Sequence, residues 1–352
     1  MSKQAALPSS NSGLQVTWLY MAIIVLAQAQ MAFNVNAIPV SIGPIVEELN
    51  VPATSVGTAL VVYSLFVAAF VMLGAKLGKI FGARLVFQVT VLLHGLAMAL
   101  MAFSQSANMM NAAQALAGIA AAALVPTLVV LIAANYNGPQ KSQALGILAA
   151  TPALSGALAF FVAGFLGTYL SWRYSFGMLT FVSIVVFLLS FRLHPVPRES
   201  GVKIDAIGVV LSAIAVILIS FGFNNLNNWG IVLASNQAPF SLVGLSPALL
   251  FVVFGLLLFQ AFFAWSHQRV ALGKMPLLSL EVLDSPKERA TIICLLVIGA
   301  LGPAVNFLIP LFIPLVQGRT TLQTAVAVVP STLSIAASAT LTSRPPSRNA
   351  TR

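Results

Sequence analysis

TSVGTALVVYSLFVAAFVMLGA, residues 54–75, is an uninterrupted apolar run without a charged side chain. An α-helix needs roughly 20 apolar residues to cross the hydrocarbon core of a bilayer, so this run predicts a membrane-spanning helix. The whole chain has the same character, because 59% of its 352 residues are hydrophobic and only 7% are charged. Soluble domains carry about 25% charged residues. The sequence therefore predicts an integral membrane protein.

The repeated apolar runs also predict which secondary structure crosses the membrane. Backbone groups inside a bilayer must be paired within the protein, so only helices and closed barrels can span it. Barrel strands would alternate apolar and polar residues, whereas these runs are continuous. We expect an all-α integral membrane bundle of about ten transmembrane helices. The expected spans are 17–38, 54–75, 85–105, 109–133, 143–170, 174–193, 206–225, 246–266, 290–315 and 324–341.

The basic residues indicate the orientation of these spans, because Lys and Arg accumulate in cytoplasmic loops. With a cytoplasmic N-terminus, every Lys and Arg except Arg173 and Arg319 falls in a cytoplasmic segment. Topology thus explains the net charge of +10, and no nucleic-acid surface is expected. The single Cys294 excludes a disulfide framework, and no metal-ligand cluster, nucleophile–base pair or phosphate-binding glycine loop is present. We therefore expect neither an enzyme nor a cofactor.

Polar residues within spans are the functional candidates, since they are costly in lipid. The span 17–38 carries Gln28, Gln30, Asn34 and Asn36 before Pro39, and these side chains could contact a substrate in a central cavity or tie helices together. His94 is the one ionisable side chain well inside a span, because all seven acidic residues fall in loops. It could relay protons, although a neutral histidine hydrogen-bonded to a neighbouring helix is the commoner arrangement.

Small residues and prolines mark the spans 109–133 and 143–170. Small residues let helices approach closely, either in static packing or at an interface that slides during a conformational change. Proline removes a helical hydrogen bond and can kink a span. The candidates for packing or kinking are Gly118, Pro126, Pro152, Gly156 and Gly164.

The segment GAKLGKIFGAR, residues 74–84, resembles the loop between spans 2 and 3 of the major facilitator superfamily. That family's pattern is roughly G-x-L-x-D-R-x-G-x-R, and Leu77, Gly82 and Arg84 match it without gaps. Lys79 stands at the position of the family's Asp, a reversal of charge. The resemblance implies a loop that gates the cytoplasmic side, formed by Gly74, Lys76, Leu77, Lys79, Gly82 and Arg84.

Other segments resemble the fourteen-span drug:proton antiporter branch of that family. NAIP, residues 36–39, is similar to the end of its first span, and SWR, residues 171–173, to the start of its sixth. The branch carries an Asp where this chain has Gln30, and the family an Arg where it has Gln114. The candidates for the substrate cavity are therefore Gln30, Asn34, Asn36, His94 and Gln114.

The resemblance implies two six-span halves, each built from inverted three-span repeats, with two extra spans between them. On this basis the second half is expected to be incomplete in this chain. The expected domains are a cytoplasmic tail (1–16), a six-span bundle (17–195), a hinge with two linker spans (196–268), a partial C-terminal half of two spans (269–341) and a polar tail (342–352).

The function implied by the resemblance is transport by alternating access, with export of small lipophilic or amphipathic drugs across a bacterial inner membrane. The expected partners are the lipid bilayer and the substrate. Protons are an open option, because the family's coupling Asp is replaced. Two alternatives remain at this point. One is a transport-dead membrane protein acting as a scaffold, a partner subunit or a remnant, and the other is an uncoupled facilitator.

Overall fold

The computed structural model describes residues 18–199, 201–278 and 285–318, and the isolated positions 323, 326, 327, 330 and 334. Within this part the helices are α1 (Leu19–Val40), α2 (Ile42–Leu49), α3 (Ala53–Phe81), α4 (Ala83–Ala102), α5 (Ala107–Asn135), α6 (Gly138–Tyr169), α7 (Arg173–Ser190), α8 (Ala206–Trp229), α9 (Pro247–Ala271) and α10 (Pro286–Gln317).

Eight of the described helices, α1 and α3–α9, are long and apolar enough to cross a membrane. They coincide with the first eight predicted spans, so the prediction of an all-α membrane bundle is confirmed. The ninth predicted span, 290–315, lies within α10. The tenth, 324–341, falls outside the described residues apart from isolated positions. The short helix α2 was not predicted; it follows α1 directly after Ser41.

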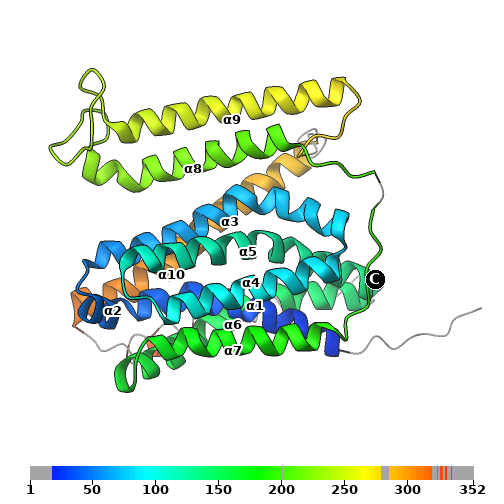
Figure 1. Ribbon diagram of the computed structural model, residues 1–352, viewed down its shortest axis with the longest axis horizontal. Coiled ribbons are helices and arrows are strands. Elements are labelled where there is room, and N and C mark those ends of the chain that lie inside the picture. The colour runs from blue at the N-terminus through cyan, green and yellow to red at the C-terminus, as the bar shows by residue number, and fades with distance from the viewer. Residues whose placement is uncertain are drawn as a thin grey trace, which may run out of the picture.

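The six helices α1 and α3–α7 form one bundle, with neighbouring spans antiparallel (Figure 1). The pairing repeats itself within this bundle. Helix α5 packs on α3 and α4, whereas α1 packs on α6 and α7, and α4 packs on α7. The set α1, α3, α4 and the set α5, α6, α7 therefore make equivalent contacts, which is the pattern that two related three-helix units produce.

Glycine brings α3 and α5 unusually close together. A Cβ atom added to Gly74 would lie 2.3 Å from the carbonyl oxygen of Ala122, and one added to Gly118 would lie 2.5 Å from that of Tyr63. Pro126 sits four residues after Ala122 inside α5 and has no N–H, so the Ala122 carbonyl lacks its helical donor. The hydrogen of Gly74 that points toward this oxygen can make a weak C–H···O contact instead.

The loop predicted over residues 74–84 is much shorter in the structure. Helix α3 continues to Phe81, and Gly82 alone separates it from α4. Gly82 adopts φ = 91°, a backbone angle that residues other than glycine rarely adopt, so the turn depends on this residue. The segment is therefore a helix end followed by a one-residue turn.

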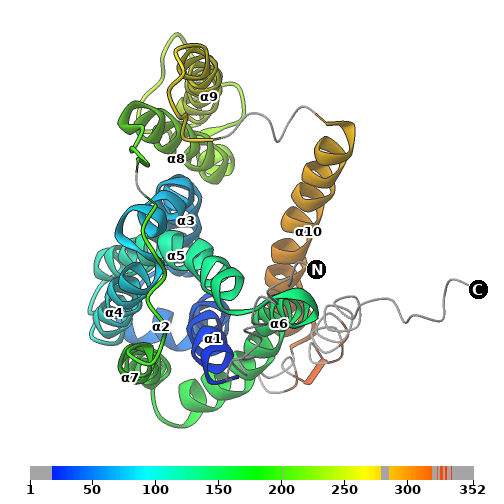
Figure 2. The same ribbon diagram turned by 90° about the vertical axis from the view of Figure 1, so that its right-hand side faces the viewer.

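Helices α8 and α9 form a separate antiparallel pair beside the bundle, and α8 leans on α3 (Figure 2). Asp205 and Ser246 cap the N-termini of α8 and α9, since their side chains accept hydrogen bonds from the backbone N–H groups of Gly208 and Ala248. Helix α10 stands apart from α8 and α9 and runs toward the α6 side of the bundle (Figure 2), where it contacts α1.

Candidate functional site

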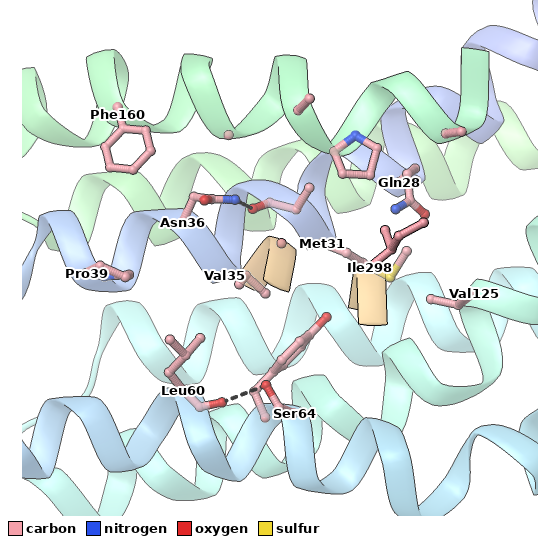
Figure 3. A pocket seen from close by; sticks show the side chains of 17 residues that line it. Gln28, Met31, Val35, Asn36, Pro39, Leu60, Ser64, Val125, Phe160 and Ile298 are labelled. Atoms are coloured by element: carbon pink, nitrogen blue, oxygen red, sulfur yellow. Dashed lines mark hydrogen bonds between the residues drawn. The ribbon is translucent and has the colours of Figure 1, made fainter. Parts of the chain in front are cut away.

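A cavity of about 570 Å³ lies between α1, α3, α5, α6 and α10 (Figure 3). Its volume falls in the range of pockets that hold small molecules, roughly 300–1,000 Å³. The described residues that line it are Gln28, Met31, Ala32, Val35, Asn36, Pro39, Leu60, Tyr63, Ser64, Val125, Ala149, Pro152, Ala153, Gly156, Phe160, Ile298 and Gly302.

Helix α1 presents one continuous stripe to this cavity, from Gln28 through Asn36 to Pro39 (Figure 3). The lining positions are three or four residues apart, which is the spacing that places side chains on one face of an α-helix. Helix α3 contributes Tyr63 and Ser64 in the same way. Helices α1 and α3 thus each turn one face toward the cavity.

Four side chains supply most of the polar groups of the lining: Gln28, Asn36, Tyr63 and Ser64. The Asn36 amide donates to the carbonyl oxygen of Ala32 at 2.7 Å, and the Ser64 hydroxyl donates to that of Leu60 at 3.1 Å. The Asn36 amide lies flat against Gly156, because a Cβ there would be 3.3–3.4 Å from its nitrogen, carbon and oxygen. The absence of a side chain at Gly156 therefore makes room for Asn36.

The remainder of the lining is apolar, and none of its described residues is Asp, Glu, Lys, Arg or His. Such a surface can bind a ligand through apolar contact, a few hydrogen bonds and the aromatic faces of Tyr63 and Phe160. Aromatic faces also attract cations. The lining therefore offers apolar and aromatic surface with a few hydrogen-bonding groups and no formal charge among its described residues.

Only one of the five predicted cavity residues, Asn36, lines this cavity. Asn34 and Gln114 face each other between α1 and α5, where each amide donates to the other at 2.9 and 3.1 Å. Gln30 accepts a hydrogen bond from the Ser183 hydroxyl of α7 at 2.8 Å. The structure thus places these three amides in contacts between helices.

His94 is completely buried in α4, and neither ring nitrogen has a hydrogen-bond partner among the described residues. The Gln30 amide nitrogen is likewise buried without a partner in this part of the chain. Both side chains lie in the interior of the bundle rather than along the cavity. The structure brings neither of them next to the stripe on α1 that a substrate would contact.

Helical periodicity explains why some of the polar residues of α1 line the cavity and others contact neighbouring helices. Gln28, Asn36 and Pro39 fall on one side of α1, whereas Gln30 and Asn34 project from the opposite side. The same spacing could have identified Tyr63 and Ser64, which stand with Leu60 on one face of the apolar run 54–75. Their polarity within that run was the available signal.

The predicted gating residues tie α3 and α4 to later segments at the end of the bundle that carries most basic residues. Lys79 forms an ion pair with Glu199 at 3.1 Å, and Arg84 donates to the carbonyl oxygen of Phe191 at 2.9 Å. Lys76 donates to the carbonyl oxygen of Pro276 at 2.7 Å. Leu77 and Gly74 line a small apolar groove of about 290 Å³ against α5. This end of the six-helix bundle is thereby joined to the hinge and to the segment after α9.

A second charged group closes the opposite end of the bundle. Glu48 at the end of α2 accepts hydrogen bonds from the Trp172 indole at 2.6 Å and from Arg173 Nε at 2.8 Å. Arg173 also donates to the carbonyl oxygen of Ala102 at 2.7 Å and lies 4.5 Å from the centre of the Trp172 ring. One carboxylate and one guanidinium thus connect the ends of α2, α4 and α7.

The predicted packing residues fall on both sides of the cavity. Pro152 and Gly156 line it from α6, and both Pro126 and Pro152 lie within continuous helices. Gly118 meets the backbone of α3, whereas Gly164 is partly exposed and accepts a hydrogen bond from Thr168 at 2.7 Å. Close approach is therefore a feature of Gly118 and Gly156 in particular.

Comparison with known proteins places this architecture in a family. The model of the family described as Major Facilitator Superfamily matches residues 24–351. The puromycin resistance protein pur8 of Streptomyces alboniger is 27% identical over 60% of this chain and 43% of its own length. The cephamycin export protein CmcT of Amycolatopsis lactamdurans is 26% identical over 86% of this chain and 60% of its own length.

The methyl viologen resistance protein SmvA of Salmonella typhimurium is 27% identical over 58% of this chain and 42% of its own length. The chain therefore spans about half the length of the curated relatives that it matches. The family match confirms the predicted resemblance and the predicted membrane fold. On this match over nearly its whole length, the chain belongs to the Major Facilitator Superfamily.

Proposed function

We propose that this chain takes part in the export of small lipophilic or amphipathic compounds by alternating access, at the cytoplasmic membrane of a bacterium. The observation that carries the proposal is the cavity between α1, α3, α5 and α6, which combines an apolar lining with a few amide and hydroxyl groups. The names of the relatives support it, since they refer to resistance against puromycin and methyl viologen and to cephamycin export.

The packing around the cavity fits a mechanism in which helices tilt against one another. Small residues at the α3–α5 and α1–α6 contacts let the helix backbones slide past each other, because no large side chains interlock there. The Glu48–Arg173 contact holds one end of the bundle together, and the Lys79–Glu199 contact ties α3 to the hinge at the other. Exchange between these two sets of contacts would open the cavity to one side at a time.

The proposal does not include proton coupling through a carboxylate of the cavity, because no described lining residue is acidic. The energy source is a separate question that a protonophore answers. Loss of export on collapse of the proton gradient would support proton coupling by another group. Export that continues only down the substrate gradient would support the uncoupled facilitator instead.

The test is efflux of a fluorescent lipophilic cation from bacterial cells that express this chain and lack their own broad exporters. Puromycin, a cephamycin and methyl viologen serve as further substrates in growth assays. We expect efflux from the parent chain and a several-fold loss in the Asn36→Leu variant, which removes the amide from the cavity.

The matched control is Asn225→Leu. Asn225 makes the same kind of hydrogen bond within its own helix, to the carbonyl oxygen of Phe221 at 2.8 Å, but on α8 away from the cavity. Equal loss in both variants would count against the cavity as the binding site. No efflux of any of these compounds, from protein shown to be in the membrane, would favour the scaffold or remnant interpretation.

A further inference from the structure

The connection between α8 and α9, residues 230–246, has more exposed apolar surface than a loop in water requires. None of its residues is charged, and the whole stretch from Ala206 to Ser266 lacks Asp, Glu, Lys, Arg and His. Surface loops of soluble parts are normally polar. The exposed large apolar side chains of this connection are Ile231, Val232, Leu233, Phe240, Leu242 and Val243.

The connection is ordered by its own hydrogen bonds. The Leu245 N–H donates to the carbonyl oxygen of Leu242 at 3.0 Å, and the Ser246 N–H donates to that of Val232 at 2.8 Å. Leu245 also forms isolated antiparallel bridges with Leu233 and Leu242. These contacts fold the connection into a small hairpin that projects its tip in a defined direction.

The residue at the tip, Val243, is of a type that this kind of turn disfavours. Val243 and Gly244 are the central residues of the turn and have φ values of 55° and 78°. Turns with positive φ at both central positions strongly favour Asn, Asp or Gly at the first, since a β-branched side chain is strained there. Val243 is nevertheless 95% exposed. A strained valine that is almost fully exposed among the described residues points to a contact outside them.

The position of the hairpin indicates what that contact is. In Figure 1 the connection lies at the ends of α8 and α9, and part of it rises past α9 on the side that faces away from the bundle. Helix α9 itself has exposed apolar side chains, such as Phe254 and Leu257. In a membrane such exposed apolar side chains face lipid, and the connection at the end of the same helix pair has exposed apolar side chains as well.

An aromatic cluster supports the base of the hairpin. The ring of Phe251 lies 5.8 Å from Phe221, 6.1 Å from Trp229 and 6.2 Å from Phe240, measured between ring centres. Trp229 is half-buried and stands at the very end of α8. Tryptophan at the end of a span is typical of the boundary between headgroups and acyl chains.

We propose that residues 230–246 form a membrane-interface anchor, in which Val243 and the adjacent apolar side chains insert among the lipid headgroups and the upper acyl chains of the leaflet opposite the basic helix ends. The anchor fixes the depth and tilt of the α8–α9 pair in the bilayer. It does not depend on what the cavity transports.

The test measures the environment of the tip in liposomes. In a Cys294→Ala background, a single cysteine replaces Val243 and carries an environment-sensitive nitrobenzoxadiazole dye. Leu256→Cys, on an exposed face of α9, provides the lipid reference, and Lys203→Cys, in the polar hinge, provides the water reference. Quenching is measured with iodide in the water and with lipids spin-labelled at the headgroup.

We expect the dye at position 243 to be quenched several-fold less by iodide than the dye at position 203, and strongly by headgroup spin labels. Iodide quenching equal to that at position 203 would place the tip in water and overturn the proposal. Protection from iodide without quenching by spin-labelled lipid would show that protein covers the tip, for example a second copy, and would overturn it equally. If the Val243→Cys protein fails to fold, Leu242→Cys at the adjacent turn position gives the same readout.

Discussion

The side-chain amides of Asn34 and Gln114 donate hydrogen bonds to each other across the contact between α1 and α5, at 2.9 and 3.1 Å, and neither side chain is exposed. Each amide thus uses one N–H donor and its carbonyl oxygen in this pair inside the bundle. A reciprocal pair of this kind fixes the register of two helices, because a shift of either one would leave buried polar atoms without partners.

This pairing predicts that Asn34→Leu or Gln114→Leu alone destabilises the protein more than both substitutions together. A single change leaves one buried amide without a partner, at a cost of about 1–3 kcal/mol. Thermal unfolding in detergent, with all four combinations, measures the coupling. Additive losses in the double variant would show that the two amides act independently.

Gly74→Ala should lower the thermal stability of the protein and its yield in the membrane. The new methyl group would lie 2.3 Å from the Ala122 carbonyl oxygen, so α3 and α5 must move apart. Gly57→Ala on the same helix is the control, since a Cβ there meets nothing within 4 Å. Alanine is about 1 kcal/mol better than glycine within a helix, so this control should be neutral or stabilising. Equal behaviour of the two variants would contradict the close approach at Gly74.

Asp205→Ala should destabilise the α8–α9 pair more than Asp205→Asn does. The Asp205 carboxylate is only 1% exposed, caps α8, accepts from the Trp265 indole at 3.0 Å and lies 3.7 Å from Arg269 Nε. Asparagine retains the two hydrogen bonds but removes the charge that faces Arg269. The fluorescence of Trp265 in a background without the other tryptophans reports local opening. Adding Arg269→Gln to Asp205→Asn should restore part of the stability, because it removes the uncompensated charge.

Glu48→Gln should lower the melting temperature slightly, and the loss should shrink as the salt concentration rises. The Glu48–Arg173 pair is partly exposed, with 43% and 27% of the side chains accessible, so its contribution is expected to be about 0.2–1 kcal/mol. Salt screens the attraction within such a pair, whereas added salt would not change a loss of stability caused by poorer packing. The same substitution at Glu199, which pairs with Lys79 at the other end of the bundle, is the matched comparison. A salt-independent loss would argue against an electrostatic role for Glu48.

The spans were predictable because lipid imposes a simple requirement on composition. Apolar runs such as 54–75 and 206–225 lie within α3 and coincide with most of α8. Composition reveals less about where a helix ends. Residues 74–84 were predicted as a loop from their resemblance to a family loop, yet helix α3 continues to Phe81 and only Gly82 separates it from α4.

The site was predicted less completely than the spans. Asn36, Pro152 and Gly156 do line the cavity, whereas Gln30 lies on the opposite side of α1 from Asn36. Polarity within a span marks a residue as unusual without telling whether it faces a cavity or a neighbouring helix, since both environments satisfy a polar group. Tyr63 and Ser64 were missed because each is common in an apolar span.

By itself, the sequence determined that this protein is helical, embedded in a membrane and built on a major facilitator pattern, and its basic loops predict the orientation. These properties follow from local rules, namely the length of an apolar run and the placement of Lys and Arg. Only the tertiary structure decided that Asn36 faces the cavity while Asn34 pairs with Gln114, and that Gly74 rather than Gly57 meets another backbone. The physical reason is that these roles depend on which helix lies opposite each face, and that neighbour comes from segments about 50 to 120 residues away in the chain.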